Sequence, residues 1–162
     1  MLKIKSCALS GETGHEAGRR LLRELYAAEI GGEMPDILIS PRGKPYFSQG
    51  KLHFSISHTR RHAFCALSDR PVGIDAEESD RAVRPELLKK ALSASEFARC
   101  AAFPDPNQAF LRLWVLKEAA AKLSGQGLRG YPNTTAFSPE DPRVELRDGC
   151  FFAIMQEEEY AL

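Results

Sequence analysis

The segment from Gln108 to Ser124 carries the longest helical pattern in the chain, and it limits the folds that the rest can form. Its larger apolar residues recur at helical spacing and predict one buried stripe: Leu113, Leu116, Ala120 and Leu123. Short strand patterns separated by turns fill most of the remaining sequence. One long helix among many short strands indicates the α+β class.

Several shorter elements surround this helix. Alternating or apolar runs predict strands at 2–8, 37–40, 53–57, 62–68, 72–77, 144–146 and 150–156, with Phe137 also read as part of a closing strand. Helices are predicted at 17–30, 86–92 and 93–103, the last opened by the capping-box pair Ser93 and Glu96. The stretch PRGKPYFSQG, residues 41–50, is rich in turn formers and predicts a loop. With 162 residues, the chain fits one domain or two small halves that share a core.

The composition argues against whole classes of partner. Lys plus Arg number 22 and Asp plus Glu also number 22, so no net charge attracts nucleic acid or a membrane surface. The four cysteines are scattered without a CxxC pair, which predicts free thiols in a reducing compartment. The first residues, MLKIKSCALSGE, lack the apolar core of a secretion signal, and the longest apolar runs are too short to span a bilayer. We therefore expect a soluble cytoplasmic protein.

The run VGIDAE, residues 72–77, is the first candidate site. Residues two apart in a strand share a face, so its apolar residues are predicted to point inward and Asp75 and Glu77 to share the opposite face. Two neighbouring carboxylates repel unless a cation lies between them, and hard oxygen ligands favour Mg²⁺ or Mn²⁺. The alternative is a strand that runs out into solvent at the following EESD turn.

The run WVLKEAAAKLSG places Glu118 four residues before Lys122, one turn apart on one helix face. One interpretation is a surface ion pair that adds about 0.3–0.5 kcal/mol to helix stability. The other makes Glu118 a metal ligand or a base and lets Lys122 reach a phosphate. Trp114 lies one turn earlier on the same face, so this face changes from apolar to charged along the helix. Such a change is typical of a pocket wall and also of many amphipathic helices. The spacing alone does not choose between the two.

The run HFSISHT is the third candidate. Ser57 and His58 are adjacent on a predicted strand and face opposite ways, and no GxSxG elbow surrounds Ser57, which argues against a serine nucleophile. A phosphate contact from His58 is the functional interpretation, and a hydrogen-bonded structural histidine is the alternative. Lys44 in PRGKPYF and Arg19 near the start of a helix are ordinarily surface residues, although a helix N-terminus favours anions.

The order of these features is more specific than any one of them. GKPYF, FSISHT, VGIDAE and LWVLKEAAAKLSGQGL follow one another as in the 4'-phosphopantetheinyl transferase superfamily, and from about Ala17 to Pro139 the chain resembles its surfactin-synthetase-activating (Sfp) type. The GxDxE and WxxKEAxxK motifs, about forty residues apart, are the most specific part. The resemblance implies a monomeric single chain of two pseudo-symmetric α+β halves, about residues 1–70 and 71–162, with the active site between them.

The resemblance also implies an activity. Members move the 4'-phosphopantetheine arm of coenzyme A onto a serine of an acyl or peptidyl carrier protein and release adenosine 3',5'-bisphosphate. By position, the implied metal ligands are Asp75, Glu77 and Glu118, and the implied coenzyme A contacts are Arg19, Lys44, Ser57, His58 and Lys122. Mg²⁺, or Mn²⁺, would bridge phosphate oxygens, and Lys122 would offer its charge to the phosphate and to the leaving group. Glu118 would act as base for the serine, directly or through water.

The chain departs from the pattern of this type in several places. Ser55 and Thr59 stand where many relatives have Asn and Ser. The chain is shorter than typical members at both ends, and the lysine-bearing segment that precedes the Arg19 helix in those proteins is largely missing. Lys3 and Lys5 are the remaining candidates for contacts to the 3'-phosphate of coenzyme A.

Two other functions stay open on sequence alone. A Mg²⁺-dependent phosphohydrolase could use the same carboxylates, although it gives no reason for the GKP and SHT motifs. A degenerate homologue could bind carrier protein or coenzyme A without turnover, although the intact acidic and lysine positions argue against it. The basic residues that follow VGIDAE are predicted to dock an acidic carrier protein, with ordinary solvated charges as the alternative: Arg81, Arg84, Lys89 and Lys90, with Arg99 on the next helix.

Overall fold

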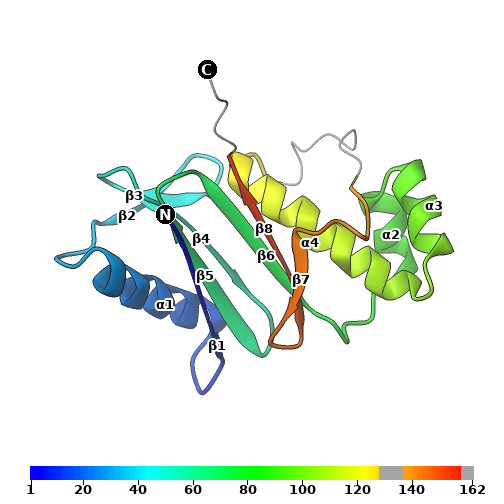
Figure 1. The fold of residues 1–162 in the computed structure, drawn as a ribbon, viewed down its shortest axis with the longest axis horizontal. Helices are drawn as coiled ribbons and strands as arrows, with labels where there is room; N and C mark the ends of the chain where they lie inside the picture. The colour runs from blue at the N-terminus through cyan, green and yellow to red at the C-terminus, as the bar shows by residue number, and fades with distance from the viewer. Residues whose placement is uncertain (128–136, 158–162) are drawn as a thin grey trace.

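The computed structural model describes residues 1–127 and 137–157 of the chain (Figure 1). Its strands are β1 (Leu2–Ala8), β2 (Ile37–Ile39), β3 (Pro45–Phe47), β4 (His53–His58), β5 (His62–Ser68), β6 (Val72–Glu78), β7 (Val144–Arg147) and β8 (Cys150–Gln156). Its helices are α1 (Gly14–Glu29), α2 (Pro85–Ala91), α3 (Ala94–Ala102) and α4 (Pro106–Ser124). Mixed helices and sheets confirm the α+β class.

Two three-stranded antiparallel sheets form the frame of the molecule. The first has the order β1-β5-β4 with α1 packed against it, and the second has the order β6-β8-β7 with α4 packed against it. Both follow the sequence strand, helix, strand, strand, apart from the β2–β3 hairpin inserted in the first and the helices α2 and α3 in the second. The division at about residue 70 and the pseudo-symmetry of the halves stay predictions.

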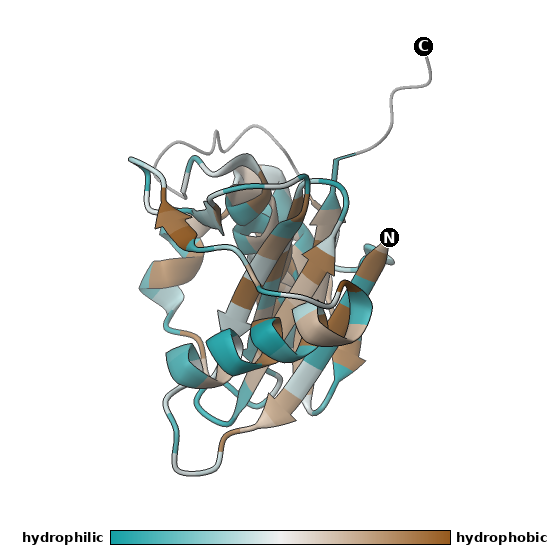
Figure 2. Ribbon diagram, turned by 90° about the vertical axis from the view of Figure 1, so that its left-hand side faces the viewer, coloured by the Kyte–Doolittle hydropathy of each residue, from teal (hydrophilic) through white to brown (hydrophobic). Residues whose placement is uncertain are grey.

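The helix α1 begins earlier than the sequence analysis predicted, because Thr13 and Glu16 form a capping box that precedes the apolar pattern. The Thr13 N–H donates to the Glu16 carboxylate at 2.8 Å, and the Glu16 N–H donates to the Thr13 hydroxyl at 3.2 Å. Gly14 permits this start, since an added Cβ would lie 2.4 Å from Cγ of His58. The buried side of α1 lies on the first sheet, and Figure 2 shows much hydrophilic colour along its outer side.

The two sheets meet where β4 lies beside β6, and serine side chains join them. The hydroxyl of Ser55 accepts a hydrogen bond from the N–H of Ile74 at 3.0 Å, and the hydroxyl of Ser57 accepts one from the N–H of Ala76 at 3.2 Å. These bonds replace a backbone ladder at this edge of β6 and satisfy its buried donors. They fix the position of β6 against β4, and with it the position of the VGIDAE motif.

The close packing of α4 on β6 depends on Gly73, the glycine of the VGIDAE run. A Cβ added there would lie 2.1 Å from the carbonyl oxygen of Ala119 and 2.4 Å from the backbone nitrogen of Leu123. Only glycine lets the helix approach the strand this closely. The carboxylates of β6 and the charged residues of α4 are therefore brought to one edge of the contact.

Some predicted elements differ from the observed ones. Residues Pro45–Phe47 within the predicted loop form β3, which pairs with β2, and Phe137 is buried but lies outside any strand. The helix α4 is buried on most sides, whereas Leu123 of the predicted stripe is only partly buried. All four cysteines are free, as predicted. Among the described residues, no helix combines the length and the apolar character needed to cross a bilayer.

A buried ion pair joins α3 to α4. Nζ of Lys117 lies 2.7 Å from the carboxylate of Glu96, which also accepts hydrogen bonds from the N–H groups of Ser93 and Phe137. Burial raises the pKa of Glu96, but these contacts outweigh it, and the net pKa lies below the usual 4.5. The capping bond of Glu96 follows from the local sequence, whereas the ion pair does not, because Lys117 is far from Glu96 in the sequence.

Replacing Lys117 by methionine is expected to lower the free energy of unfolding at pH 7 by about 3–5 kcal/mol, because Glu96 is left as an unpaired buried charge. A carboxyl with a lowered folded pKa stabilises the native state above its unfolded pKa and loses that effect as the pH falls. The difference in unfolding free energy between the wild type and Lys117→Met should therefore become smaller below about pH 4.5. Urea unfolding at pH 7 and pH 4 measures both effects, and an equal deficit at both values would contradict the pair.

Candidate active site

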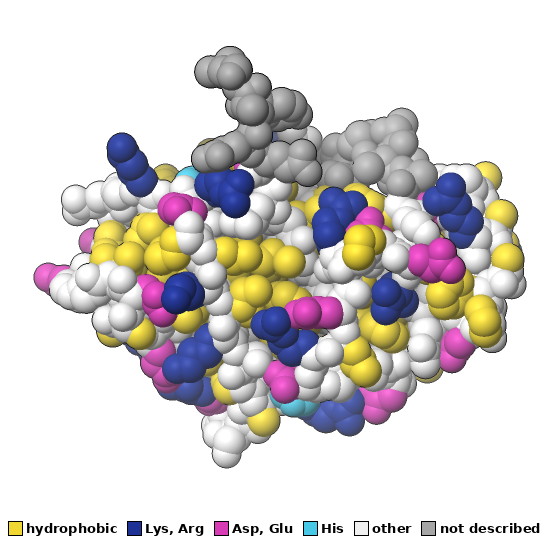
Figure 3. All heavy atoms as spheres, viewed as in Figure 1, with side chains coloured by type: hydrophobic (Ala, Val, Ile, Leu, Met, Phe, Trp, Pro, Cys, Tyr) yellow, Lys and Arg dark blue, Asp and Glu magenta, His cyan; other side chains and the backbone are white. Residues whose placement is uncertain are grey.

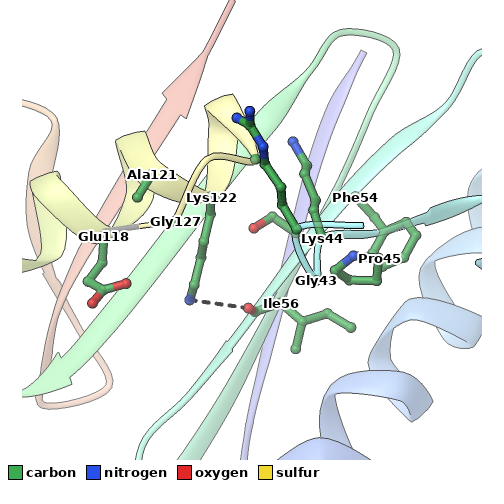
Figure 4. Close-up of a pocket in the computed structure, with 12 residues that line it drawn as sticks. Gly43, Lys44, Pro45, Phe54, Ile56, Glu118, Ala121, Lys122 and Gly127 are labelled. Atoms are coloured by element: carbon green, nitrogen blue, oxygen red, sulfur yellow. Dashed lines mark hydrogen bonds between the residues drawn. The ribbon is translucent and has the colours of Figure 1, made fainter. Parts of the chain in front are cut away.

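A cavity of about 610 Å³ opens where β4, β6, α1 and α4 come together, and most of the predicted site residues line it. Its lining includes Arg19, Ser57, His58, Asp75, Glu77, Arg81, Trp114, Glu118 and Lys122. A smaller adjoining cavity of about 230 Å³ shares Glu118 and Lys122 with it and adds Arg42 and Lys44 (Figure 4). Contributions from α1, β4, β6 and α4 bring together motifs that are far apart in the sequence.

Asp75 is the most enclosed of the three carboxylates, with 6% of its surface exposed. Its Oδ1 accepts a hydrogen bond from the Ser57 hydroxyl at 2.9 Å and lies 2.7 Å from Nζ of Lys122. The same Nζ donates to the backbone carbonyl of Ile56 at 3.4 Å (Figure 4). Asp75 is thus oriented by a hydroxyl and a cation from two other elements, and it does not run out into solvent.

Glu77 lies on the same face of β6 and has a different cationic partner. Nη1 of Arg81, at the turn after the strand, lies 2.5 Å from the Glu77 carboxylate. The neutralising cations of this site therefore come from α4 for Asp75 and from the β6–α2 connection for Glu77. Arg81, one of the basic residues predicted to dock the carrier protein, lines the cavity beside a predicted metal ligand.

Glu118 projects from α4 on the same side as Lys122 (Figure 4). The ion pair between the two, which the spacing left open as one interpretation, is not formed, because Lys122 pairs with Asp75. Burial and the charge of Asp75 raise the pKa of Glu118, Lys122 opposes them, and Glu77 adds a smaller increase; together they bring the pKa to about 7. A carboxyl with a pKa near neutrality can take up a proton at physiological pH, as a general base must.

The donor set of the cavity fits a hard divalent cation. Three carboxylates from two elements face one space, and each of Asp75 and Glu77 already attracts a cationic side chain. Carboxylate oxygens are the ligands that Mg²⁺ and Mn²⁺ favour. The oxygens of these three carboxylates do not all lie within 4.8 Å of one another. Among the described residues, one other set of candidate metal ligands does lie that close together.

That other set is His62 at the start of β5, Glu78 at the end of β6 and Cys150 at the start of β8. Both oxygens of Glu78 are already engaged, because the backbone N–H of Arg61 donates to one at 3.1 Å and its guanidinium pairs with the other. Sγ of Cys150 lies 3.8 Å from Nδ1 of His62. An arginine that occupies the carboxylate makes this a structural cluster joining β5, β6 and β8.

The predicted coenzyme A contacts fall into two groups. Arg19 and His58 line the cavity, and no hydrogen bond or ion pair of either side chain is found among the described residues. The hydroxyl of Ser57 is used to hold Asp75 and β6, and Nζ of Lys44 donates to the carbonyl of Leu123 at 2.7 Å, at the end of α4. Burial lowers the pKa of Lys44.

Lys3 and Lys5, the candidates for contacts to the 3'-phosphate of coenzyme A, lie away from the two cavities. Both lie on β1, which β5 separates from β4, so neither lines either cavity. Lys3 pairs with Glu29 at 3.0 Å and Lys5 with Glu24 at 2.6 Å, both on α1. On the face shown in Figure 3, basic and acidic side chains are likewise interspersed, as expected for a chain without net charge.

The sequence is similar to characterised proteins over most of its length. The family model of the 4'-phosphopantetheinyl transferase superfamily matches residues 71–160 of the chain. A 4'-phosphopantetheinyl transferase of Bacillus subtilis is 32% identical over 160 residues, which cover 90% of this chain and 70% of that protein. The 4'-phosphopantetheinyl transferase psf-1 of Bacillus pumilus is 33% identical over 133 residues, covering 80% and 56%. Sfp of Bacillus subtilis strain 168 is 32% identical over 116 residues, covering 68% and 51%.

The chain thus spans between 51% and 70% of the length of these three relatives. The matched range, residues 71–160, contains all three carboxylates and Lys122. The similarity and the motifs agree on one conclusion: the chain belongs to the 4'-phosphopantetheinyl transferase superfamily and is a member of its Sfp type.

Proposed function

We propose that the protein transfers 4'-phosphopantetheine from coenzyme A to a serine of an apo acyl or peptidyl carrier protein, with Mg²⁺ as the metal and Mn²⁺ as an alternative. The observation that carries this proposal is that Asp75, Glu77, Glu118 and Lys122 all line one cavity. Arg19 and His58 line the same cavity, and neither side chain has a hydrogen bond or ion pair within residues 1–127 and 137–157, so they can offer positive or hydrogen-bonding groups to the phosphates of coenzyme A. Three named relatives are 4'-phosphopantetheinyl transferases.

The reaction assigns a task to each group. The serine oxygen of the carrier attacks the phosphorus that bears pantetheine, the bond from that phosphorus to the bridging oxygen breaks, and adenosine 3',5'-bisphosphate leaves with the electron pair. Glu118 accepts the serine proton directly or through water. Lys122 is held beside Asp75, where its charge can stabilise the phosphate oxygens.

Asp75, Glu77 and Glu118 would hold the metal ion. When bound, the ion supplies Lewis-acid stabilisation of the pyrophosphate oxygens. The protein side chains position the reacting groups around that charge: Ser57 orients Asp75 through its 2.9 Å hydrogen bond, and Gly73 allows β6 to lie directly against α4.

One experiment separates this activity from its rivals. The protein is incubated with coenzyme A, Mg²⁺ and a panel of apo-carrier proteins, and intact mass spectrometry follows both the carriers and coenzyme A. We expect one carrier to gain the mass of one phosphopantetheine. Cleavage of coenzyme A without carrier modification would support a phosphohydrolase, and binding without either product would support a homologue that lacks turnover.

We propose that the carrier docks on the exposed basic residues around α2. Arg84, Lys89 and Lys90 are exposed, and none forms an ion pair within the described part of the chain. Reversing the charges of Arg84 and Lys89 should raise the KM for carrier protein several-fold and flatten its salt dependence, because rim charges act mainly on the encounter rate. The KM for coenzyme A should not change. Equal effects on both substrates, or none, would place docking elsewhere.

A further inference from the structure

Arg81 occupies a position that neither the docking prediction nor the proposed metal site explains. Its guanidinium pairs with Glu77 at 2.5 Å, and both residues line the large cavity. The backbone of Arg81 is anchored, since its carbonyl accepts a hydrogen bond from the Asn107 side chain at 2.9 Å and its N–H donates to the carbonyl of Glu78 at 3.0 Å. The side chain is 42% exposed. A fixed backbone with a partly exposed side chain lets the guanidinium exchange partners while staying at the cavity.

Glu77 depends on this arginine more than Asp75 depends on its own partner. Asp75 has two partners, the hydroxyl of Ser57 and the ammonium of Lys122. Among the described residues, the ion-pair partner of Glu77 is Arg81. A divalent cation bound by Glu77 would compete with the guanidinium for the same carboxylate. The ion pair of Glu77 is partly exposed and formed by one arginine, and such pairs are weak enough to be displaced.

We propose that Arg81 is the resident counterion of Glu77, that a divalent cation displaces it on binding, and that the released guanidinium then binds a phosphate group of the substrate. This proposal rests on the proposed function, because it assumes that the carboxylates hold a metal and that the cavity takes a substrate with phosphates. A guanidinium presents a planar fork of donors that matches phosphate oxygens, and a lysine does not. Without ligands, Glu77 and Arg81 neutralise each other. With metal and substrate bound, the cation would neutralise Glu77 and the phosphate would neutralise Arg81.

The exchange predicts effects of opposite sign from one substitution. Arg81→Gln removes the competitor, so the Kd for Mn²⁺ of the protein without coenzyme A should fall about two- to fivefold. With saturating metal, the same substitution removes a phosphate ligand, so the Kd for coenzyme A should rise about tenfold. A residue that only supported the fold would weaken both ligands together.

The test measures Mn²⁺ binding by electron paramagnetic resonance and coenzyme A binding by isothermal titration calorimetry. Arg81→Lys keeps the charge without the fork, so it should bind Mn²⁺ nearly as the wild type does and coenzyme A less tightly. Arg60→Gln is the matched control, because Arg60 is an exposed arginine of the β4–β5 turn outside both cavities. It removes the same charge and should alter neither Kd by more than about twofold.

The outcomes distinguish this inference from the function beneath it. Tighter Mn²⁺ binding together with weaker coenzyme A binding in Arg81→Gln supports the exchange. Unchanged or weaker Mn²⁺ binding in Arg81→Gln, with normal binding by the wild type, overturns the exchange and leaves the metal site intact. Unchanged coenzyme A binding overturns the phosphate contact. Failure of the wild type to bind Mn²⁺ at all overturns the metal site and this inference with it.

Discussion

Turnover of the Glu118→Gln protein should fall by about two to four orders of magnitude, because glutamine keeps the shape of the side chain and removes the base. The same change removes one of the proposed carboxylate ligands, so the concentration of Mg²⁺ needed for half-maximal residual activity should rise. Steady-state kinetics with a carrier protein across a Mg²⁺ series measures both effects. Near-normal turnover in a folded variant would exclude Glu118 as base and as ligand.

The stability of Glu118→Gln should change in the direction opposite to that expected for a lost helix ion pair. Burial and the charges of Asp75 and Glu77 raise the pKa of Glu118 to about 7 from the usual 4.5. The folded state therefore binds a proton more tightly than the unfolded state, and stability falls as the pH rises from about 4.5 to about 7. At pH 8 the ionised carboxylate destabilises the metal-free protein, and glutamine removes that charge.

We therefore expect metal-free Glu118→Gln to have a higher Tm than the wild type at pH 8 and about the same Tm at pH 4.5. Differential scanning calorimetry with a chelator present measures the difference. Glu140→Gln, at an exposed glutamate outside both cavities, serves as control. A lower Tm of Glu118→Gln at pH 8 would favour a stabilising ion pair, which is the alternative that the four-residue spacing left open.

The sequence predicts the placement of the main catalytic candidates because period and motif are local properties. Alternation along β6 places Asp75 and Glu77 on one face, and helical spacing places Glu118 and Lys122 on another. Both faces do line the large cavity. The elements themselves follow the same rule, since the strands and helices with clear periodicity were found within a few residues of their observed ends.

The choice of partners could not be predicted, because it depends on packing between distant elements. Lys122 pairs with Asp75, 47 residues away in the sequence, and not with Glu118 on its own helix. Lys44 donates to the carbonyl of Leu123, 79 residues away. The early start of α1 is different, since Thr13 and Glu16 carry a capping-box pattern that was visible in the sequence and was missed.

Substitutions at Asp75 should separate its role in catalysis from its role in the fold. An exposed carboxylate would contribute little to stability, but Asp75 is buried and joins the hydroxyl of Ser57 to the ammonium of Lys122. Asparagine keeps a carbonyl oxygen that can accept both hydrogen bonds, whereas alanine leaves the Ser57 hydroxyl without this acceptor and leaves Lys122 with the carbonyl of Ile56. The two variants therefore share the loss of the ionic metal ligand and differ in what they do to the native contacts.

Both Asp75→Asn and Asp75→Ala should lose Mg²⁺-dependent transfer by at least about two orders of magnitude. Asp75→Ala should in addition lose about 1–3 kcal/mol of unfolding free energy, because a polar group that is left unsatisfied keeps its full desolvation penalty. Transfer assays across a Mg²⁺ series and urea unfolding measure the two effects, with Asp36→Asn, outside both cavities, as control. Wild-type activity in a folded Asp75→Asn protein would contradict the three-carboxylate site. Equal stability of the two variants would show instead that Lys122 and Ser57 find other partners. The contacts of Asp75 would then orient the carboxylate without holding β4 and α4 against β6.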